Sequence, residues 1–181
     1  MYYIKWIIYL IIFAVIAAFL HYTLPQHDVV RITDTYAKRM DVGENPMFWA
    51  RGDAGTAAGQ VNREVFFIQS VNRDGKPRVY RNEDTGWGWP PYFKFDNSNL
   101  QTEATDLKST KEAPQWVKVT HYGWRMELWT VFPNAISVKA VADPDARIIP
   151  WLNIVILLTM FAIFWAIRVR VLRFWERRFG G

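Results

Sequence analysis

The residues best suited to chemistry lie in one short run, residues 78–95, which mixes charged and aromatic side chains with glycine and proline. Flat rings on a rigid loop bury much area at low entropic cost, which suits the binding of a glycan or peptide. The alternative is structural: the tryptophans plug the bottom of a β-domain and the charges pair across the loop. Because aromatic side chains usually fill cores, we favour this structural interpretation. The residues of the candidate site are Arg81, Glu83, Asp84, Trp87, Trp89 and Tyr92.

No group of residues predicts catalysis. Glu83 and Asp84 are adjacent, so on an extended backbone they point to opposite faces, whereas glycosidase carboxylates lie roughly 5 to 9 Å apart across a cleft. Two of the three histidines, His21 and His27, flank a proline, and His121 stands alone in a predicted strand. With no cysteine, we expect no metal site. The sequence also lacks a nucleophile elbow and a glycine-rich phosphate loop, so we expect neither enzymatic activity nor a cofactor.

Two apolar stretches are long enough to cross a membrane. Residues 2–20 carry one charge, Lys5, and residues 148–167 carry none. A helix of roughly 20 residues crosses a hydrocarbon core of about 30 Å. The first stretch could instead be a cleaved signal peptide, but residues 19–23 lack the small-residue pattern of a cleavage site, so we favour an anchor. Tryptophans suited to the membrane interface stand near the ends of both stretches, at Trp6, Trp151 and Trp165.

The positive charge of the chain is concentrated at its two ends. Residues 21–147 hold as many Lys and Arg as Asp and Glu, whereas Lys5 precedes them and five arginines follow. Basic residues beside a span tend to stay in the cytoplasm. We therefore expect an inner-membrane protein with a first transmembrane helix (1–21), a periplasmic domain (22–147), a second transmembrane helix (148–169) and a cytoplasmic tail (170–181). The neutral domain offers no basic patch, so nucleic acid is not an expected partner.

The tail is predicted to continue the second helix as a basic amphipathic segment. Its apolar residues gather on one side and its arginines on the other. Such a helix lies on anionic phospholipid, each arginine contributing about 1 kcal/mol, or docks in a groove of a partner protein. The simplest interpretation is an anchor that only sets orientation. Its basic and aromatic residues are Arg168, Arg170, Arg173, Trp175, Arg177 and Arg178.

Each span has one pair of small residues four positions apart. The pair of the first span is Ala14 and Ala18, and the pair of the second span is Ala162 and Ala166. Such pairs let helix backbones approach closely, so these are candidate helix-packing residues. In an antiparallel arrangement the two pairs lie at different depths, so they would meet another protein or another copy rather than each other. Because alanine is common in membrane spans, we favour the interpretation that these alanines have no specific packing role.

Residues 22–147 have mainly the pattern of strands. Strands are predicted at 28–36, at 63–71 and 77–80 around an Asp-Gly turn, and as a three-stranded meander at 115–122, 124–132 and 135–141 with a bend at Gly123. A short helix is predicted at 98–108 with Asn97 or Ser98 as its N-cap, and a loop at 51–62. The expected fold is two transmembrane helices flanking a small β-barrel or sandwich with one short helix.

Four segments carry a resemblance to a known family: residues 79–96, 29–32, 122–125 and 132–135. They are similar to an uncharacterised, largely alphaproteobacterial family of small membrane proteins that bears a domain-of-unknown-function label. The resemblance implies a bacterial inner-membrane setting and carries over no activity, cofactor or site. From the plain spans and the lack of catalytic groups we expect a non-catalytic accessory, structural or assembly subunit of a larger membrane protein complex, such as a respiratory or photosynthetic one. The alternative is a periplasmic glycan- or peptide-binding module.

Overall fold

The structure, a computed structural model, describes residues 2–41 and 62–179 and divides into two compact units, Met1–Arg147 and Ile148–Gly181. The first unit holds helix α1 (Tyr2–Thr23) and a β-rich domain, and the second holds helix α3 (Trp151–Phe179). Both helices are long and apolar enough to cross a membrane. The predicted fold of two candidate membrane-spanning helices flanking a β-rich domain is therefore confirmed. Most of the predicted loop at 51–62 falls outside the described residues.

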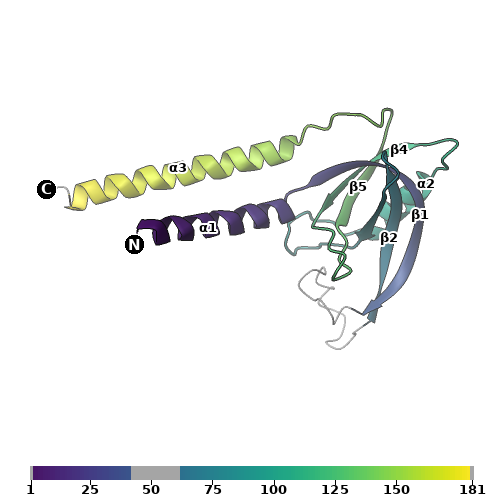
Figure 1. Cartoon of the computed structure of the whole chain (residues 1–181), viewed down its shortest axis with the longest axis horizontal. Coiled ribbons are helices and arrows are strands. Elements are labelled where there is room, and N and C mark those ends of the chain that lie inside the picture. The colour runs from purple at the N-terminus through teal and green to yellow at the C-terminus, as the bar shows by residue number, and fades with distance from the viewer. Residues whose placement is uncertain (1, 42–61, 180–181) are drawn as a thin grey trace. The chain divides into compact units, whose positions relative to one another are not determined.

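Five strands close into a barrel in the order β1-β2-β3-β5-β4. The barrel begins at the C-terminal end of α1 (Figure 1). All neighbouring strands are antiparallel except β3 and β5, which run parallel with Arg81 opposite Asn134. Closure leaves no open sheet edge among these strands, which protects a small domain from edge-to-edge pairing. The strand bounds are β1 (Gln26–Asp41), β2 (Asn62–Asn72), β3 (Pro77–Asn82), β4 (Trp116–Tyr122) and β5 (Asn134–Val141).

The predicted hairpin between β2 and β3 is confirmed. The strands pair from Phe66 opposite Asn82 to Val71 opposite Pro77. At the turn, Gly75 has a φ of +78°, and its N–H donates to the carbonyl oxygen of Asn72 at 3.0 Å. Glycine readily adopts a positive φ, which tight hairpin turns require. The Asp-Gly pair therefore predicted this turn correctly from local sequence.

The predicted middle strand of the meander, residues 124–132, is wrong. β4 pairs directly with β5 from Trp116 opposite Val141 to Tyr122 opposite Asn134. Residues 124–132 instead form a loop with one isolated bridge, between Met126 and Val131. The predicted bend at Gly123 is present, with a φ of +91°. The loop folds on itself because Nη1 of Arg125 donates to the carbonyl oxygens of Met126 and Val131.

Helix α2 (Asn97–Asp106) packs Leu100 and Ala104 into the apolar centre of the barrel. The helix confirms the one predicted at 98–108. Its N-cap is Asp96 rather than Asn97 or Ser98: the Asp96 carboxylate accepts the backbone N–H of Asn99 at 2.9 Å, which satisfies one of the helix's free donors. The barrel side chains of this core are Val30, Ile32, Ile68, Tyr80, Val117, Val119, Ala135 and Val138.

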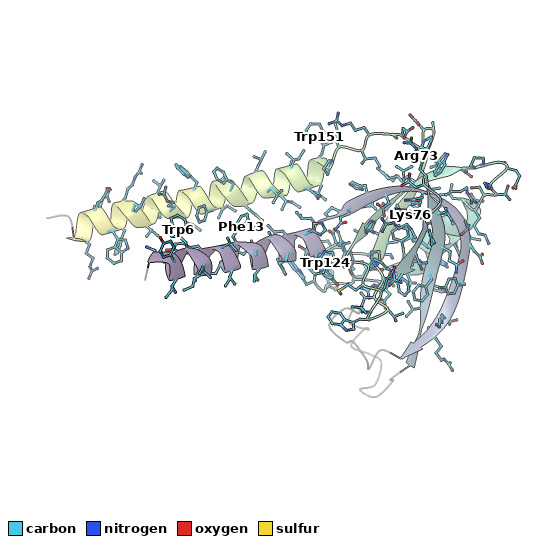
Figure 2. All side chains as sticks on the ribbon, viewed as in Figure 1. Trp6, Phe13, Arg73, Lys76, Trp124 and Trp151 are labelled. Carbon is cyan, nitrogen blue, oxygen red and sulfur yellow. The ribbon has the colours of Figure 1, made fainter. Side chains whose placement is uncertain are left out.

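The barrel is attached to the last turn of α1 by several contacts besides the chain itself. The Gly123 N–H donates to the carbonyl oxygen of Tyr22 at 2.9 Å, and the Trp124 indole packs edge-on against the Tyr22 ring, with centroids 5.4 Å apart. Nε1 of Trp124 also donates to Nδ1 of His21 at 2.8 Å, and its side chain lies where α1 meets the barrel (Figure 2). Bonds from the β4–β5 connection therefore fix this part of the barrel to α1.

Candidate functional site

The predicted aromatic site lies in the connection between β3 and α2, residues 83–96, which we call the aromatic loop. Its first residue is fixed by a buried polar group. The Arg81 guanidinium lies 3.1 Å from the Glu83 carboxylate, and both side chains are almost fully buried, at 3% and 6% exposed. Asn134 of β5 holds the backbone of Glu83 on both sides, accepting its N–H at 2.9 Å and donating to its carbonyl at 3.0 Å. The charges at the base of the loop therefore pair inside the domain, and Glu83 has a structural partner.

Lys94 closes the other side of the aromatic loop. Its buried Nζ donates to the carbonyl oxygens of Ala135 at 2.9 Å and Glu83 at 3.1 Å, and to the Asn82 side chain. Burial lowers the pKa of this ammonium to about 8, although the nearby carboxylates of Asp84 and Glu83 act to raise it. The lysine thus ties both ends of the loop to β3 and β5.

The two tryptophans of the aromatic loop lie on its surface. Trp87 is 85% exposed and Trp89 66% exposed, and Phe93 and Phe95 are also exposed. The Trp87 ring meets Phe93 and Phe95 at 5.5 Å between centroids, at interplanar angles of 69° and 60°. The structural interpretation is therefore wrong for the tryptophans, because they do not fill the barrel. Buried Arg81, Glu83 and Lys94 support the loop from within, and the Trp87, Phe93 and Phe95 rings are exposed.

Two rings of the aromatic loop contact the end of α1. Trp89 stacks on Phe19 with centroids 5.7 Å apart. The Tyr92 hydroxyl donates to the carbonyl oxygen of Thr23, and its ring stacks on Tyr122 at 5.2 Å. Burial raises the pKa of Tyr92, so it stays a neutral donor at physiological pH. Because Phe19 is part of the apolar stretch of α1, the loop lies level with the C-terminal turns of that helix.

Sequence inspection missed a second polar group, which β1, β3 and β4 bring together. The Asp28 carboxylate accepts the Tyr80 hydroxyl at 2.6 Å, and Nε2 of His121 lies 3.1 Å from the same oxygen. A signal was present: Asp28 alternates in phase with Val30 and Ile32, and His121 with Val117 and Val119, so both belong to the inward faces of their strands. Their pairing became visible only with the strand order.

The electrostatics of this group favour an ionised Asp28. Burial acts to raise the pKa of its carboxyl, but the hydrogen bonds from His121 and Tyr80 outweigh it and hold the pKa below its ordinary value. Burial and the neighbouring Asp28 charge raise the pKa of the Tyr80 phenol, so the hydroxyl remains a donor. Asp28 and His121 line a pocket of about 340 Å³, here called the Asp28–His121 pocket, together with Gln26, Arg78, Gly123, Trp124, Arg125 and Pro133.

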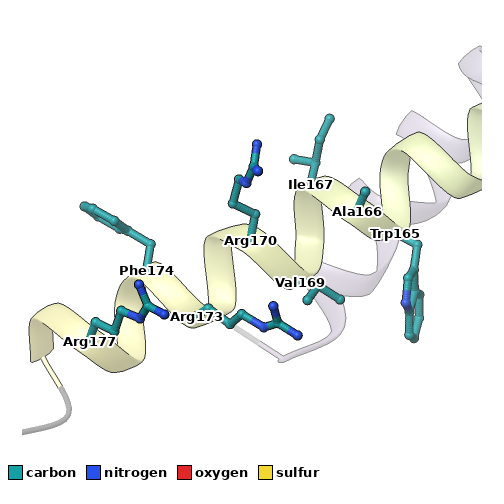
Figure 3. A pocket seen from close by; sticks show the side chains of 8 residues that line it. All are labelled: Trp165, Ala166, Ile167, Val169, Arg170, Arg173, Phe174 and Arg177. Carbon is teal, nitrogen blue, oxygen red and sulfur yellow. The ribbon is translucent and has the colours of Figure 1, made fainter.

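The predicted basic tail is the C-terminal part of α3, which runs without a break to Phe179. Arg170, Arg173 and Arg177 line one flank of this helix together with Phe174 (Figure 3). The guanidinium of Arg168 lies 5.5 Å from the centre of the Trp165 ring, and that of Arg178 lies 5.9 Å from the Phe174 ring. The predicted contact of the tail with phospholipid stays a prediction.

The predicted helix-packing alanines are exposed on their own helices. Ala14 and Ala18 are exposed on α1, and Ala162 and Ala166 are exposed on α3. Exposure of a small residue on its own helix leaves it available for close contact with another helix. Packing of Ala14 and Ala18, or of the α3 pair, against another protein or another copy stays a prediction.

The remaining predicted residues also lie along the two long helices. Trp6 and Trp151 project from α1 and from the first residue of α3 (Figure 2). Among the residues that the structure describes, no group of three or more His, Asp and Glu side chains could hold a metal ion.

Comparison with known proteins places the chain in a family. A family model described as "Protein of unknown function (DUF1523)" matches residues 1–175. An "Uncharacterized protein" of Haemophilus influenzae is 39% identical over 145 residues, which cover 78% of each chain. No solved structure matches. The match to nearly the whole length, together with this identity, shows that the chain belongs to the DUF1523 family.

Proposed function

We propose that this protein is a non-catalytic accessory subunit of a larger bacterial inner-membrane complex, with both termini cytoplasmic and the barrel in the periplasm. The observation that carries the proposal is the outward-facing set of rings on the aromatic loop, led by Trp87 at 85% exposed. Contiguous exposed aromatic surface marks interaction sites, and tryptophan is enriched among the residues that dominate interface energy.

The position of these rings favours an integral membrane partner. Trp89 rests on Phe19 of α1, so the exposed surface continues from the apolar part of that helix onto the barrel. A partner that is itself embedded in the membrane can contact both. The neutral charge of residues 21–147 favours the same class, because it provides no electrostatic attraction for a strongly charged soluble partner.

The alternative, a glycan- or peptide-binding module, depends on the same exposed rings and is less well supported by their angles. Sugar recognition uses flat faces turned to the ligand. Trp87 meets Phe93 at 69°, and one face of Trp89 is occupied by Phe19. The rings therefore form an irregular apolar surface, which suits the packing of side chains from another protein. Binding of the wild type to isolated cell wall, lost in Trp87→Ala, would favour the alternative.

The test is affinity purification of the tagged full chain from native membranes in mild detergent, followed by mass spectrometry. We expect a defined set of membrane proteins at constant stoichiometry, which is lost from the double variant Trp87→Ala/Phe93→Ala. The matched control is Trp6→Ala, which removes an exposed ring from the other end of α1 and should retain the partners. Recovery of the wild type alone, as a monomer, would refute the proposal.

A further inference from the structure

His121, which lines the Asp28–His121 pocket, has a buried nitrogen for which the described residues supply no hydrogen-bond partner. The His121 side chain is only 7% exposed, and its Nδ1 is one of the buried polar atoms left without a partner in the described residues. A carboxylate can only accept, so Nε2 is the atom that donates to Asp28 at 3.1 Å. In the neutral ring Nδ1 is then an acceptor, and leaving it unsatisfied costs about 1 to 3 kcal/mol. A ligand with an O–H group would remove that cost.

The same pocket holds two guanidinium groups. Arg78 is exposed at the start of β3, and its charge acts on Asp28. Arg125 is held in place by its bonds to the carbonyl oxygens of Met126 and Val131 and lies 4.4 Å from the centre of the Phe132 ring. Guanidinium groups are suited to phosphate, with which they form charge-assisted hydrogen bonds.

The acidic side chain of the pocket, Asp28, disfavours some of the ligands that the two arginines would otherwise bind. Asp28 would repel a bare phosphate, but it already accepts two hydrogen bonds and orients the imidazole that would receive a hydroxyl. A ligand that carries a hydroxyl beside its phosphate can bind His121 through the hydroxyl and the two arginines through the phosphate. A volume of about 340 Å³ fits a group of that size and falls at the small end of ligand pockets.

The pocket also borders the outer end of α1. Trp124, one of its walls, donates to Nδ1 of His21, and Gln26, another, donates to the His21 carbonyl at 2.8 Å. His21 lies within the last turn of a helix that is apolar enough to cross a membrane. Headgroups of lipids lie at this level, so the pocket is accessible to them as well as to soluble molecules.

We propose that the Asp28–His121 pocket binds a phosphate ester with a free hydroxyl, the chemistry of a glycerol-phosphate group, through His121 on the hydroxyl and Arg78 and Arg125 on the phosphate. This chemistry occurs in the headgroup of phosphatidylglycerol and in soluble glycerol 3-phosphate. The proposal does not depend on the accessory role, because the pocket lining and the exposed rings of the aromatic loop share no residue.

The test compares lipids of equal charge on the detergent-solubilised full chain by native mass spectrometry. Phosphatidylethanol carries the same phosphodiester as phosphatidylglycerol but no hydroxyl, so we expect it to bind about tenfold more weakly, the equivalent of one hydrogen bond. Soluble glycerol 3-phosphate, titrated against the same protein by calorimetry, distinguishes the sources. Binding of it alone identifies a soluble ligand, and a preference for phosphatidylglycerol alone identifies the lipid.

Arg78→Gln is the variant of choice because this side chain is exposed and its loss leaves the barrel core intact. We expect at least a tenfold loss of binding. The matched control is Lys76→Gln. It removes one positive charge two residues from Arg78, and because Lys76 does not line the pocket, the variant should bind as the wild type does. Equal binding of phosphatidylglycerol and phosphatidylethanol without any binding of glycerol 3-phosphate, or unchanged binding by Arg78→Gln, would overturn the proposal.

Discussion

Lys94 offers a quantitative test of how the aromatic loop is held. Its Nζ donates to Asn82, Glu83 and Ala135 in the interior, and its pKa is lowered to about 8 from an ordinary 10.5. The change Lys94→Met keeps most of the volume and removes all three donors. Asn134 still donates to the Glu83 carbonyl in this variant, so two buried acceptors are left unsatisfied, and at about 2 kcal/mol for each the loss is about 4 kcal/mol. Removing the buried charge stabilises the fold by about 3 kcal/mol, so we expect the variant to be about 1 kcal/mol less stable at pH 7.

The pH dependence of the free energy of unfolding distinguishes the effect of the Lys94 charge from the effect of side-chain packing. Because the folded pKa is lower than the unfolded one, the unfolded chain binds more protons at this site between about pH 8 and 10.5. Stability of the wild type should therefore rise with pH in this window, by about 2 to 3 kcal/mol between pH 7 and 10. Methionine has no such titration. The stability gap between wild type and Lys94→Met should thus widen by that amount.

The assay is urea unfolding of the full chain in non-ionic detergent, followed by tryptophan fluorescence at several pH values from 7 to 10. Other titrating groups, such as Tyr80, are present in both proteins and cancel in the difference. Lys76→Met is the matched control, since that lysine is exposed in the turn between β2 and β3. A gap for Lys94→Met that is constant or narrows with rising pH would show that the ammonium is not destabilised by burial.

Three further changes test the barrel by the same unfolding assay. Tyr80→Phe removes the hydroxyl that donates to Asp28 at 2.6 Å and should cost about 1 to 3 kcal/mol, whereas an unchanged midpoint would mean that this bond contributes nothing. Gly123→Ala places a side chain at a φ of +91° and should cost about 1 to 3 kcal/mol, although a new Cβ would meet no atom closer than 3.7 Å; a neutral effect would contradict the backbone-strain argument. Leu100→Ala empties a site in the core and should cost about 2 to 5 kcal/mol, and a loss below 1 kcal/mol would show that α2 contributes little to it.

Local signals in the sequence were sufficient for the elements that depend on neighbours along the chain. The two long helices follow from apolar length, and the β2–β3 hairpin follows from the Asp-Gly turn, where Gly75 takes its positive φ. The error at residues 124–132 has a physical cause. Alternation at Trp124, Met126 and Leu128 imitates a strand, but Leu128 is 96% exposed, so the alternation does not follow a buried face.

The contacts of Asp28 with Tyr80 and His121 could not be predicted from the sequence, because they depend on strands that are distant along the chain. Tyr80 and His121 lie 52 and 93 residues from Asp28 along the chain. Only the pairing of β1 with β4, which sets Gln26 opposite His121, brings the histidine to this position. The sequence shows that each side chain faces inward, but it does not show that they face one another.

The aromatic loop reverses the usual distribution of polar and apolar groups, and this reversal argues for an interaction surface. A connection that merely capped the barrel would gain free energy by turning Trp87 inward and Lys94 outward. Instead the charges of Arg81, Glu83 and Lys94 are buried, where desolvation opposes them, and Trp87 is exposed to solvent. Both placements lower the stability of the isolated chain. A partner that covers the rings recovers the apolar term, and the buried polar group keeps the loop rigid enough to present them.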